Sequence, residues 1–228
     1  MLLSTLSEMK CKQNVLKSTD GSVEFSQGDT VVLVGAYGPA DCKESKQDVK
    51  EAIVEVNFRP KIGIPGIAEK YLEQFVKGVC ESCIQRSLHP RTTFSIIVQV
   101  IQDRGSLLSC AINGTSMALQ DAGISMKFMP VAVTVALKHK EEVSMETDCG
   151  TEDYDVIFSP SLEEEEKAFA NLTLVFDSVK SELVSTYASG PMTSFQYQQC
   201  LMSAKNVSKS IVQFFRDSVS KKLAADVL

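Results

Sequence analysis

The chain has 228 residues, of which 44% are hydrophobic, and a formal net charge of −6 at pH 7. This length and apolar content predict a globular protein with a substantial buried core, organised as a single domain over residues 1–228. No apolar run reaches the roughly 20 residues that a membrane-spanning helix needs, and the N-terminus lacks the pattern of a secretory signal. We therefore expect no membrane contact and a location in the cytosol or nucleus.

The negative charge is confined to one segment. Residues 141–166 contain eleven acidic residues and no Lys or Arg, which leaves a charge of +5 for the rest of the chain. Residues 59–91 have a balance of +3, and residues 196–223 have a balance of +4. Either basic segment could face phosphate groups, but a charged helix face is usually only solvated, and we favour that interpretation for the C-terminal segment.

The seven cysteines are odd in number and scattered, as is typical of proteins that keep their thiols reduced. Cys80 and Cys83 form a single CxxC pair within a helical pattern, without the second Cys or His pair that a zinc site needs. We interpret both as small buried apolar residues. His89 and His139 also lack partners at motif spacing. We therefore expect no metal site.

The first half of the chain predicts strands around one long helix. Residues 22–38 read as two strands around a Gly28-Asp29 turn, and residues 50–60 read as a half-buried strand. The loop "PKIGIPG" follows, and we expect it to be mobile. Apolar residues at helical spacing predict an amphipathic helix over residues 67–88. A buried β-branched strand follows at residues 92–102.

The second half predicts a helix at about residues 109–121, ended by Gly123, and then more strands and a final helix. Further strands are expected at residues 130–139, at "YDVIF" and, as a pair, within residues 168–190. A hairpin connection or exposed loop is expected between residues 138 and 153. The final helix opens at Pro191 and Thr193, and its apolar stripe consists of Leu201, Ala204, Val207, Ile211, Phe214, Phe215 and Val219. This order predicts an α+β fold with helices packed on mixed sheets.

Four segments carry a family resemblance, and they occur in the order and spacing of that family. They are "GSVEFSQGDTVVLVGAYGP", "VEVNFRP", "HPRTTFSIIVQVIQDRGS" and "AINGTSMALQDAGI". Together they resemble the RNase PH family over most of the chain. The "RPKIGIPG" loop, the "HPRT" turn and the "GSLL" signature are similar to one of the RNase PH-type ring subunits of the eukaryotic RNA exosome, in a subgroup that includes a cell-death-related nuclease. The family's usual arginine-containing opening before the first strand is missing.

The resemblance implies an RNase PH-like fold of two βαβ-type halves with mixed sheets and a long C-terminal helix. It also implies pairing with other RNase PH-type exosome subunits, closure into a hexameric ring that carries cap subunits, and passage of single-stranded RNA through the central pore. Active members use inorganic phosphate to release nucleoside diphosphates from a 3′ end. The implied location is the nucleus, including the nucleolus, and the cytoplasm.

Phosphorolysis brings a phosphate dianion to an anionic phosphodiester, so its site must supply positive charge or many oriented donors. In active relatives a Gly-Thr-Arg-Thr-like turn supplies an arginine, two hydroxyls and helix amides. The resemblance places that turn at Gly105, Ser106, Leu107 and Leu108. The arginine has therefore become Leu107, and the second hydroxyl has become Leu108. We predict that Ser106 and Ser109 still cap the helix.

The other parts of this site also depart from the pattern that the resemblance implies. Arg104 precedes the turn, and we expect its side chain to leave on the opposite face. The family's carboxylate pair aligns with Glu165 and Asn171, to within one or two residues. Asparagine cannot exchange a proton at neutral pH, so the general-acid role would be lost. The acidic run at residues 163–166 is interpreted as an exposed helix start or loop. The alternative is that its carboxylates gather Mg²⁺ for hydrolysis.

We therefore expect a ring subunit that has lost phosphorolysis, needs no cofactor, and serves assembly and RNA guidance in rRNA and mRNA processing. The residues expected near RNA are Arg59, Lys61, Lys70, Lys77, Arg91 and Arg104. Their phosphate contacts would be independent of sequence and sensitive to salt. The alternative for these residues is pairing with Glu69, Glu73 or Glu81, or with a neighbouring subunit.

Two other functions stay open. The first is a homodimer outside the ring that binds RNA or DNA and either cleaves it, with Mg²⁺ as a possible cofactor, or assists another nuclease. The second is a scaffold without nucleic-acid contact.

Overall fold

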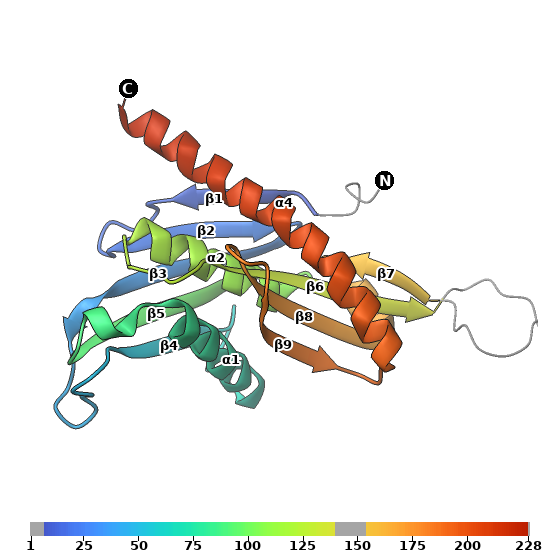
Figure 1. Ribbon diagram of the computed structural model, residues 1–228, viewed down its shortest axis with the longest axis horizontal. Coiled ribbons are helices and arrows are strands. Elements are labelled where there is room, and N and C mark those ends of the chain that lie inside the picture. The colour runs from blue at the N-terminus through green and yellow to red at the C-terminus, as the bar shows by residue number, and fades with distance from the viewer. Residues whose placement is uncertain (1–6, 140–153, 228) are drawn as a thin grey trace, which may run out of the picture.

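The computed structural model describes residues 7–139 and 154–227 (Figure 1). The first sheet contains β1 (Met9–Gln13), β2 (Gly21–Gln27), β3 (Thr30–Asp41), β4 (Ile53–Arg59) and β5 (Thr92–Gln102), in the order β1-β2-β3-β5-β4. Its pairings are antiparallel except for β4 and β5, which run parallel and are connected through α1 (Ile67–Cys83). Each strand predicted for this half of the chain is present.

The second sheet contains β6 (Pro130–His139), β7 (Tyr154–Phe158), β8 (Ala170–Asp177) and β9 (Leu183–Ser189), in the order β7-β6-β8-β9. The helix α3 (Leu162–Lys167) lies between β7 and β8 in the chain. The α+β class is confirmed, but all pairings in this sheet are antiparallel. The prediction of mixed pairing in both halves is therefore wrong for the second half.

The loop prediction for residues 138–153 falls largely outside the described residues. At its start, Lys138 and His139 still belong to β6, where they pair with Asp155 and Tyr154 of β7. The first two residues of the predicted loop are therefore part of a strand.

The helix α2 (Leu107–Asp121) packs against both sheets. All residues from Leu108 to Leu119 are buried, because α2 contacts β1, β2, β3 and β5 of the first sheet and β6 of the second. Gly114 permits a close approach to the first sheet, since a Cβ there would lie 3.2 Å from side-chain atoms of Phe25, Val32 and Val34. A helix buried on every side accounts for the mostly apolar and small residues of this segment.

The helix α4 (Ser194–Val227) crosses the second sheet and continues past the end of α2 (Figure 1). The predicted apolar stripe is confirmed: Ala204, Ile211 and Phe215 are buried, and the other members pack against the core. The Phe25 ring of β2 meets the Phe215 ring edge-on, with centroids 6.3 Å apart. Over the described residues, no helix is long and apolar enough to cross a membrane.

Two elements differ from the sequence prediction. The helix predicted for residues 67–88 ends at Cys83, because Ile84 becomes extended and forms a β-bridge with Met126. The Lys127 amide also donates a hydrogen bond of 2.7 Å to the Cys83 carbonyl.

Strand β1 was not predicted, because its sequence "MKCKQ" lacks a strong apolar pattern and it forms by pairing with β2.

Candidate functional site

The turn between β5 and α2 has a left-handed backbone at two successive residues. Gly105 has a φ of 108° and Ser106 a φ of 54°. A Cβ at Gly105 would lie 2.5 Å from the Pro160 carbonyl oxygen and 2.6 Å from the Leu162 nitrogen. Only glycine therefore allows the segment that follows β7 to pack this closely against the turn.

Ser106 is the N-cap residue of α2, but its side chain does not cap the helix. Its hydroxyl donates to the Pro160 carbonyl at 2.9 Å, and the Ser109 hydroxyl donates to the Ser106 carbonyl at 2.9 Å. The prediction that Ser106 and Ser109 cap the helix is wrong. The physical reason is that Ser106 has a left-handed backbone instead of the extended one that a capping serine adopts.

A carboxylate of this chain accepts a hydrogen bond from the amide at the start of α2. The Ser106 N–H donates a hydrogen bond of 2.7 Å to Glu165 Oε1. The preceding amide, of Gly105, donates at 3.2 Å to Asp103 Oδ1. Burial raises the pKa of Glu165 above its ordinary value; the hydrogen bond from Ser106 opposes that rise, and the neighbouring Asp103 adds to it.

The short helix α3 holds Glu165 in this place. It begins with a capping box, in which Glu164 Oε2 accepts a hydrogen bond of 2.8 Å from the Ser161 amide. The Leu162 amide donates at 2.8 Å to the Arg104 carbonyl, which ties α3 to the turn. The acidic run is thus the start of a helix, which was one of the two predicted alternatives, but Glu164 and Glu165 are half-buried and not exposed as predicted.

Asn171, on β8, lies beside Glu165. Its Nδ2 donates at 3.1 Å to the Glu165 backbone carbonyl, and its Oδ1 is buried without a hydrogen-bond partner among the described residues. The structure therefore brings together the two residues that the resemblance aligned with a carboxylate pair. In its observed position the Asn171 side chain anchors the end of α3.

The two leucines of the turn belong to the hydrophobic core. Leu108 is 6% exposed, and the half-buried Leu107 packs against the core cluster. Neither is among the residues that line the adjacent cavity. Leu107 and Leu108 therefore contribute apolar packing at the position where a phosphate site needs a cation.

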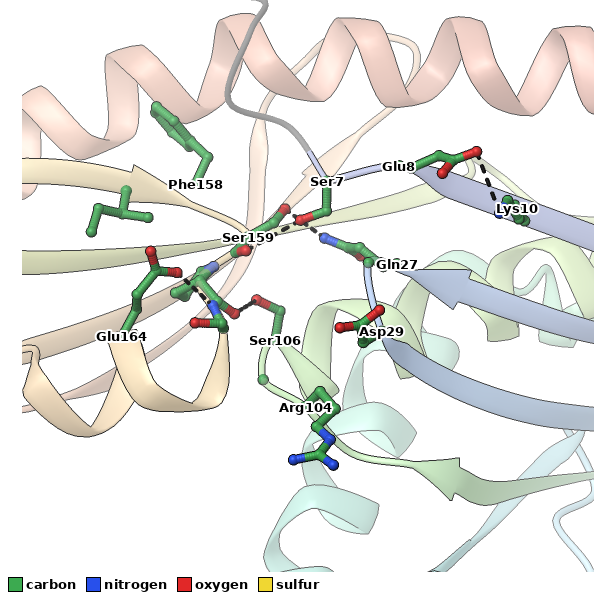
Figure 2. Close-up of a pocket in the computed structure, with 15 residues that line it drawn as sticks. Ser7, Glu8, Lys10, Gln27, Asp29, Arg104, Ser106, Phe158, Ser159 and Glu164 are labelled. Carbon is green, nitrogen blue, oxygen red and sulfur yellow. Dashed lines mark hydrogen bonds and ion pairs between the residues drawn. The ribbon is translucent and has the colours of Figure 1, made fainter.

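A cavity of about 620 Å³ opens beside the turn, between the start of β1, the β2–β3 turn and the β7–α3 connection. Figure 2 shows its polar lining, in which the Gln27 side chain reaches Ser159. Glu8, Asp29 and Glu164 contribute carboxylates to the lining, whereas Lys10 and Arg104 are its cations. Lys10 forms an ion pair with Glu8 at 3.4 Å. The Arg104 guanidinium points away from the Ser106 hydroxyl (Figure 2), in agreement with the expected direction.

Comparison with known proteins identifies the family. Residues 5–125 match the family described as 3′ exoribonuclease family, domain 1, or RNase PH. An Exosome complex exonuclease RRP46 homolog of Arabidopsis thaliana is 32% identical over an alignment of 228 positions. The alignment covers 92% of this chain and 90% of the plant protein. The chain belongs to the RNase PH family.

Solved structures of this family share the fold. The crystal structure of rice (Oryza sativa) Rrp46 matches with a TM-score of 0.84 at 31% identity, covering 94% of this chain and 95% of the rice chain. A structure of the Archaeoglobus fulgidus exosome with RNA bound to the active site matches with a TM-score of 0.75 at 18% identity, covering 92% and 89%. The archaeal likeness concerns the fold alone.

Within this RNase PH fold, two of the cations predicted to face RNA are paired. Lys70 Nζ lies 3.0 Å from Glu73 Oε1, and Lys77 Nζ lies 3.8 Å from Glu81 Oε1. Arg59, Lys61, Arg91 and Arg104 have no ion pair within the part of the chain that the structure describes. Lys70 and Lys77 therefore form ion pairs with glutamates of α1, which was the alternative to RNA contact for these residues.

The sheet register separates the predicted RNA-binding residues into two places. Because β4 and β5 are parallel, Arg59, the last residue of β4, and Arg104, two residues after β5, lie at the C-terminal ends of these strands. Lys61 comes two residues after Arg59, whereas Lys70 lies in α1. Arg91 precedes β5 at the opposite end, eight positions before Gln99, the partner of Arg59, which is about 26 Å at the usual rise per residue. Arg91 is therefore apart from Arg59 and Arg104.

The other candidate ligands have structural roles. In residues 7–139 and 154–227, no group of three His, Cys, Asp or Glu side chains could hold a metal ion. Cys80 and Cys83 are buried, and burial raises the pKa of the Cys83 thiol to about 12. The His89 ring packs edge-on against Phe94, and His139 stacks on Phe169.

A buried polar network beside the site was not predicted from the sequence. Asn113 of α2 is fully buried and forms two hydrogen bonds with the backbone of β6, to the nitrogen and oxygen of Ala132, at 2.8 and 3.0 Å. Gln27 accepts from Asn113 and donates to Ser159 at 2.8 Å. The available signal was an asparagine and a glutamine at positions that the apolar pattern assigns to the core.

Proposed function

We propose that this chain is a ring subunit of the RNA exosome that has lost phosphorolysis, and that it serves assembly and the guidance of RNA toward 3′ to 5′ degradation and rRNA and mRNA processing. Family membership supports the ring role, together with plant, yeast and worm relatives named as RRP46 exosome proteins. The loss of catalysis rests on one observation: Leu107 and Leu108 pack into the core at the turn where phosphate would need a cation.

The electrostatics of the turn support the same proposal. Two like charges a few ångströms apart repel strongly in a partly buried site, so phosphate beside an RNA phosphodiester requires compensating positive charge. Here the nearest fixed charges are the carboxylates of Asp103 and Glu165, both bonded to turn amides. Arg104, the neighbouring cation, points away from Ser106 (Figure 2). The turn therefore repels the nucleophile that phosphorolysis needs.

The surface proposed to contact RNA consists of Arg59, Lys61 and Arg104, at and just beyond the C-terminal ends of β4 and β5. Arg59 and Lys61 are exposed and lack ion pairs among the described residues, so they can contact phosphates without breaking a bond. Such contacts are sequence-independent and weaken with salt. The proposed partners are other RNase PH-type subunits and cap subunits, and the proposed location is the nucleus, including the nucleolus, and the cytoplasm.

The test of catalytic loss is an assay on uniformly labelled single-stranded RNA, with and without inorganic phosphate and with and without Mg²⁺. The proposal expects no cofactor requirement and no release of nucleoside diphosphates by the purified chain. Release that depends on phosphate would refute the loss of phosphorolysis.

RNA binding is tested separately by charge reversal. Arg59→Glu with Lys61→Glu is expected to weaken RNA binding and to lower its salt dependence, because two phosphate contacts are lost. Lys180→Glu, in the exposed β8–β9 turn, is the matched control and should bind as the unaltered chain does. Equal binding by the unaltered chain and the double variant would favour a scaffold without nucleic-acid contact.

The alternative is a homodimer outside the ring that binds RNA or DNA and cleaves it or assists another nuclease. The specific observation in its favour is that the Arabidopsis and rice relatives are named exonucleases. Phosphate-independent cleavage that requires Mg²⁺, by a chain that sediments as a dimer, would establish this alternative.

A further inference from the structure

We propose that the Glu165 carboxylate, held in place by α3, accepts the hydrogen bond of the Ser106 amide at the start of α2 and thereby prevents inorganic phosphate from binding at this turn. The inference concerns the same site as the proposed function and deepens it. The loss of the cation at Leu107 explains why phosphate is not attracted, whereas Glu165 explains why the Ser106 amide is not available to it.

Both left-handed residues of the turn already donate hydrogen bonds to carboxylates of this chain. The Ser106 amide reaches Glu165 Oε1 at 2.7 Å, and the Gly105 amide reaches Asp103 Oδ1 at 3.2 Å. Amides at the start of a helix of this length favour a negative partner. Glu165 and Asp103 supply that partner from within the molecule.

Glu165 is held in place from several sides. Its backbone carbonyl accepts from Asn171 Nδ2 at 3.1 Å. The α3 segment is anchored to the turn by the hydrogen bond between Leu162 and the Arg104 carbonyl and by the one between Ser106 and the Pro160 carbonyl. The carboxylate therefore binds Ser106 intramolecularly, at an effective concentration that free phosphate must overcome.

The contact with the Ser106 amide also depends on the length of the Glu165 side chain. Glu165 spans the gap from α3 to the Ser106 amide with two methylene groups, and its backbone is fixed by the contacts above. An aspartate at this place is one methylene shorter and cannot reach the amide without moving α3. Glu165→Asp therefore keeps the negative charge but frees the donor, which separates occupation of the amide from simple repulsion.

The experiment follows the Ser106 amide by nuclear magnetic resonance in the full-length chain while inorganic phosphate is added at constant ionic strength. The variants are Glu165→Ala and Glu165→Asp, and the matched control is Glu166→Ala, whose side chain is exposed on the same helix. Circular dichroism and thermal unfolding show whether each variant is folded.

The unaltered chain and Glu166→Ala are expected to show no saturable shift of the Ser106 amide. Glu165→Ala should show a saturable shift, with half-saturation at least about tenfold below the highest phosphate concentration that leaves the unaltered chain unshifted. Glu165→Asp should lie between them. A saturable shift in the unaltered chain would overturn the inference, and so would folded Glu165→Ala and Glu165→Asp variants that ignore phosphate. These outcomes do not depend on phosphorolysis. The proposed function is tested separately, by the RNA assay described above.

Discussion

Lys222, near the C-terminal end of α4, forms an ion pair with Asp121, the last residue of α2. The Asp121 side chain is only 4% exposed, and its other oxygen accepts a hydrogen bond of 2.9 Å from the Ser22 amide of β2. One carboxylate thus connects the last helix, the central helix and the first sheet. Because the three elements are far apart in the sequence, this contact fixes the course of α4 over the molecule.

We predict that Lys222→Met lowers the free energy of unfolding by about 1–2 kcal/mol, because Asp121 stays buried without its cation. Urea unfolding followed by circular dichroism measures the change. The exposed neighbour Lys221→Met is the control and should change stability by less than about 0.5 kcal/mol. Equal effects of the two substitutions would show that the ion pair contributes nothing specific.

A second prediction concerns the pH dependence of stability at Glu165. Its pKa is raised above the ordinary value of 4.5, so the folded chain keeps the Glu165 proton to a higher pH than the unfolded chain does. The contribution of this residue to stability is therefore greatest below pH 4.5 and is lost as the pH rises through the folded-state pKa. Glu165→Gln does not titrate, so its stability relative to the unaltered chain should increase over that interval.

Urea unfolding of both chains at a series of pH values tests this expectation, with Glu166→Gln as the control for an exposed carboxylate of the same helix. A stability difference between Glu165→Gln and the unaltered chain that does not vary with pH would contradict the raised pKa.

A third prediction concerns Gly105. An alanine there has an unfavourable φ of 108° and a Cβ 2.5 Å from the Pro160 carbonyl, so we expect Gly105→Ala to lower the free energy of unfolding by about 3 kcal/mol. Hydrogen exchange should accelerate in α3, because its segment must move away from the turn. Gly78→Ala in α1 is the matched control: its Cβ meets open space, and it should stabilise the helix by about 0.5–1 kcal/mol.

A fourth prediction concerns the buried Asn113. Asn113→Leu keeps the volume similar but leaves the amide and carbonyl of Ala132 without partners, so we expect a loss of about 2–4 kcal/mol. Asn206→Ala, at an exposed position of α4, should change stability by less than about 0.5 kcal/mol. Thermal unfolding compares them, and a loss for Asn113→Leu no larger than that of the control would refute the structural role of the amide.

Periodicity and turn residues predicted most of the fold, because strands such as β5 and helices such as α4 carry strong local patterns. The end of α1 was not predictable in this way, since Ile84 continues the apolar spacing and only its bridge to Met126 ends the helix. Strand β1 was missed for a related reason: its polar residues are ordered by the partner strand and not by their own pattern.

The candidate site shows the same division. The positions of Leu107 and Asn171 followed from the resemblance, but the contact between Glu165 and the Ser106 amide joins residues 59 apart in the chain. No local pattern encodes such a contact. The failed capping prediction has the same origin, because the left-handed backbone of Ser106 is set by the packing of residues 160–162 on Gly105.

The burial of α2 on both sides has a consequence for synthesis on the ribosome. The helix is complete at Asp121, but β6, which covers its second side, spans Pro130–His139 and pairs with β8, which ends at Asp177. While the intervening residues emerge, an apolar helix stays exposed in the nascent chain, and such surfaces promote aggregation and attract chaperones. The first sheet is therefore finished early in translation, but its central helix is fully covered only when the second sheet has been made.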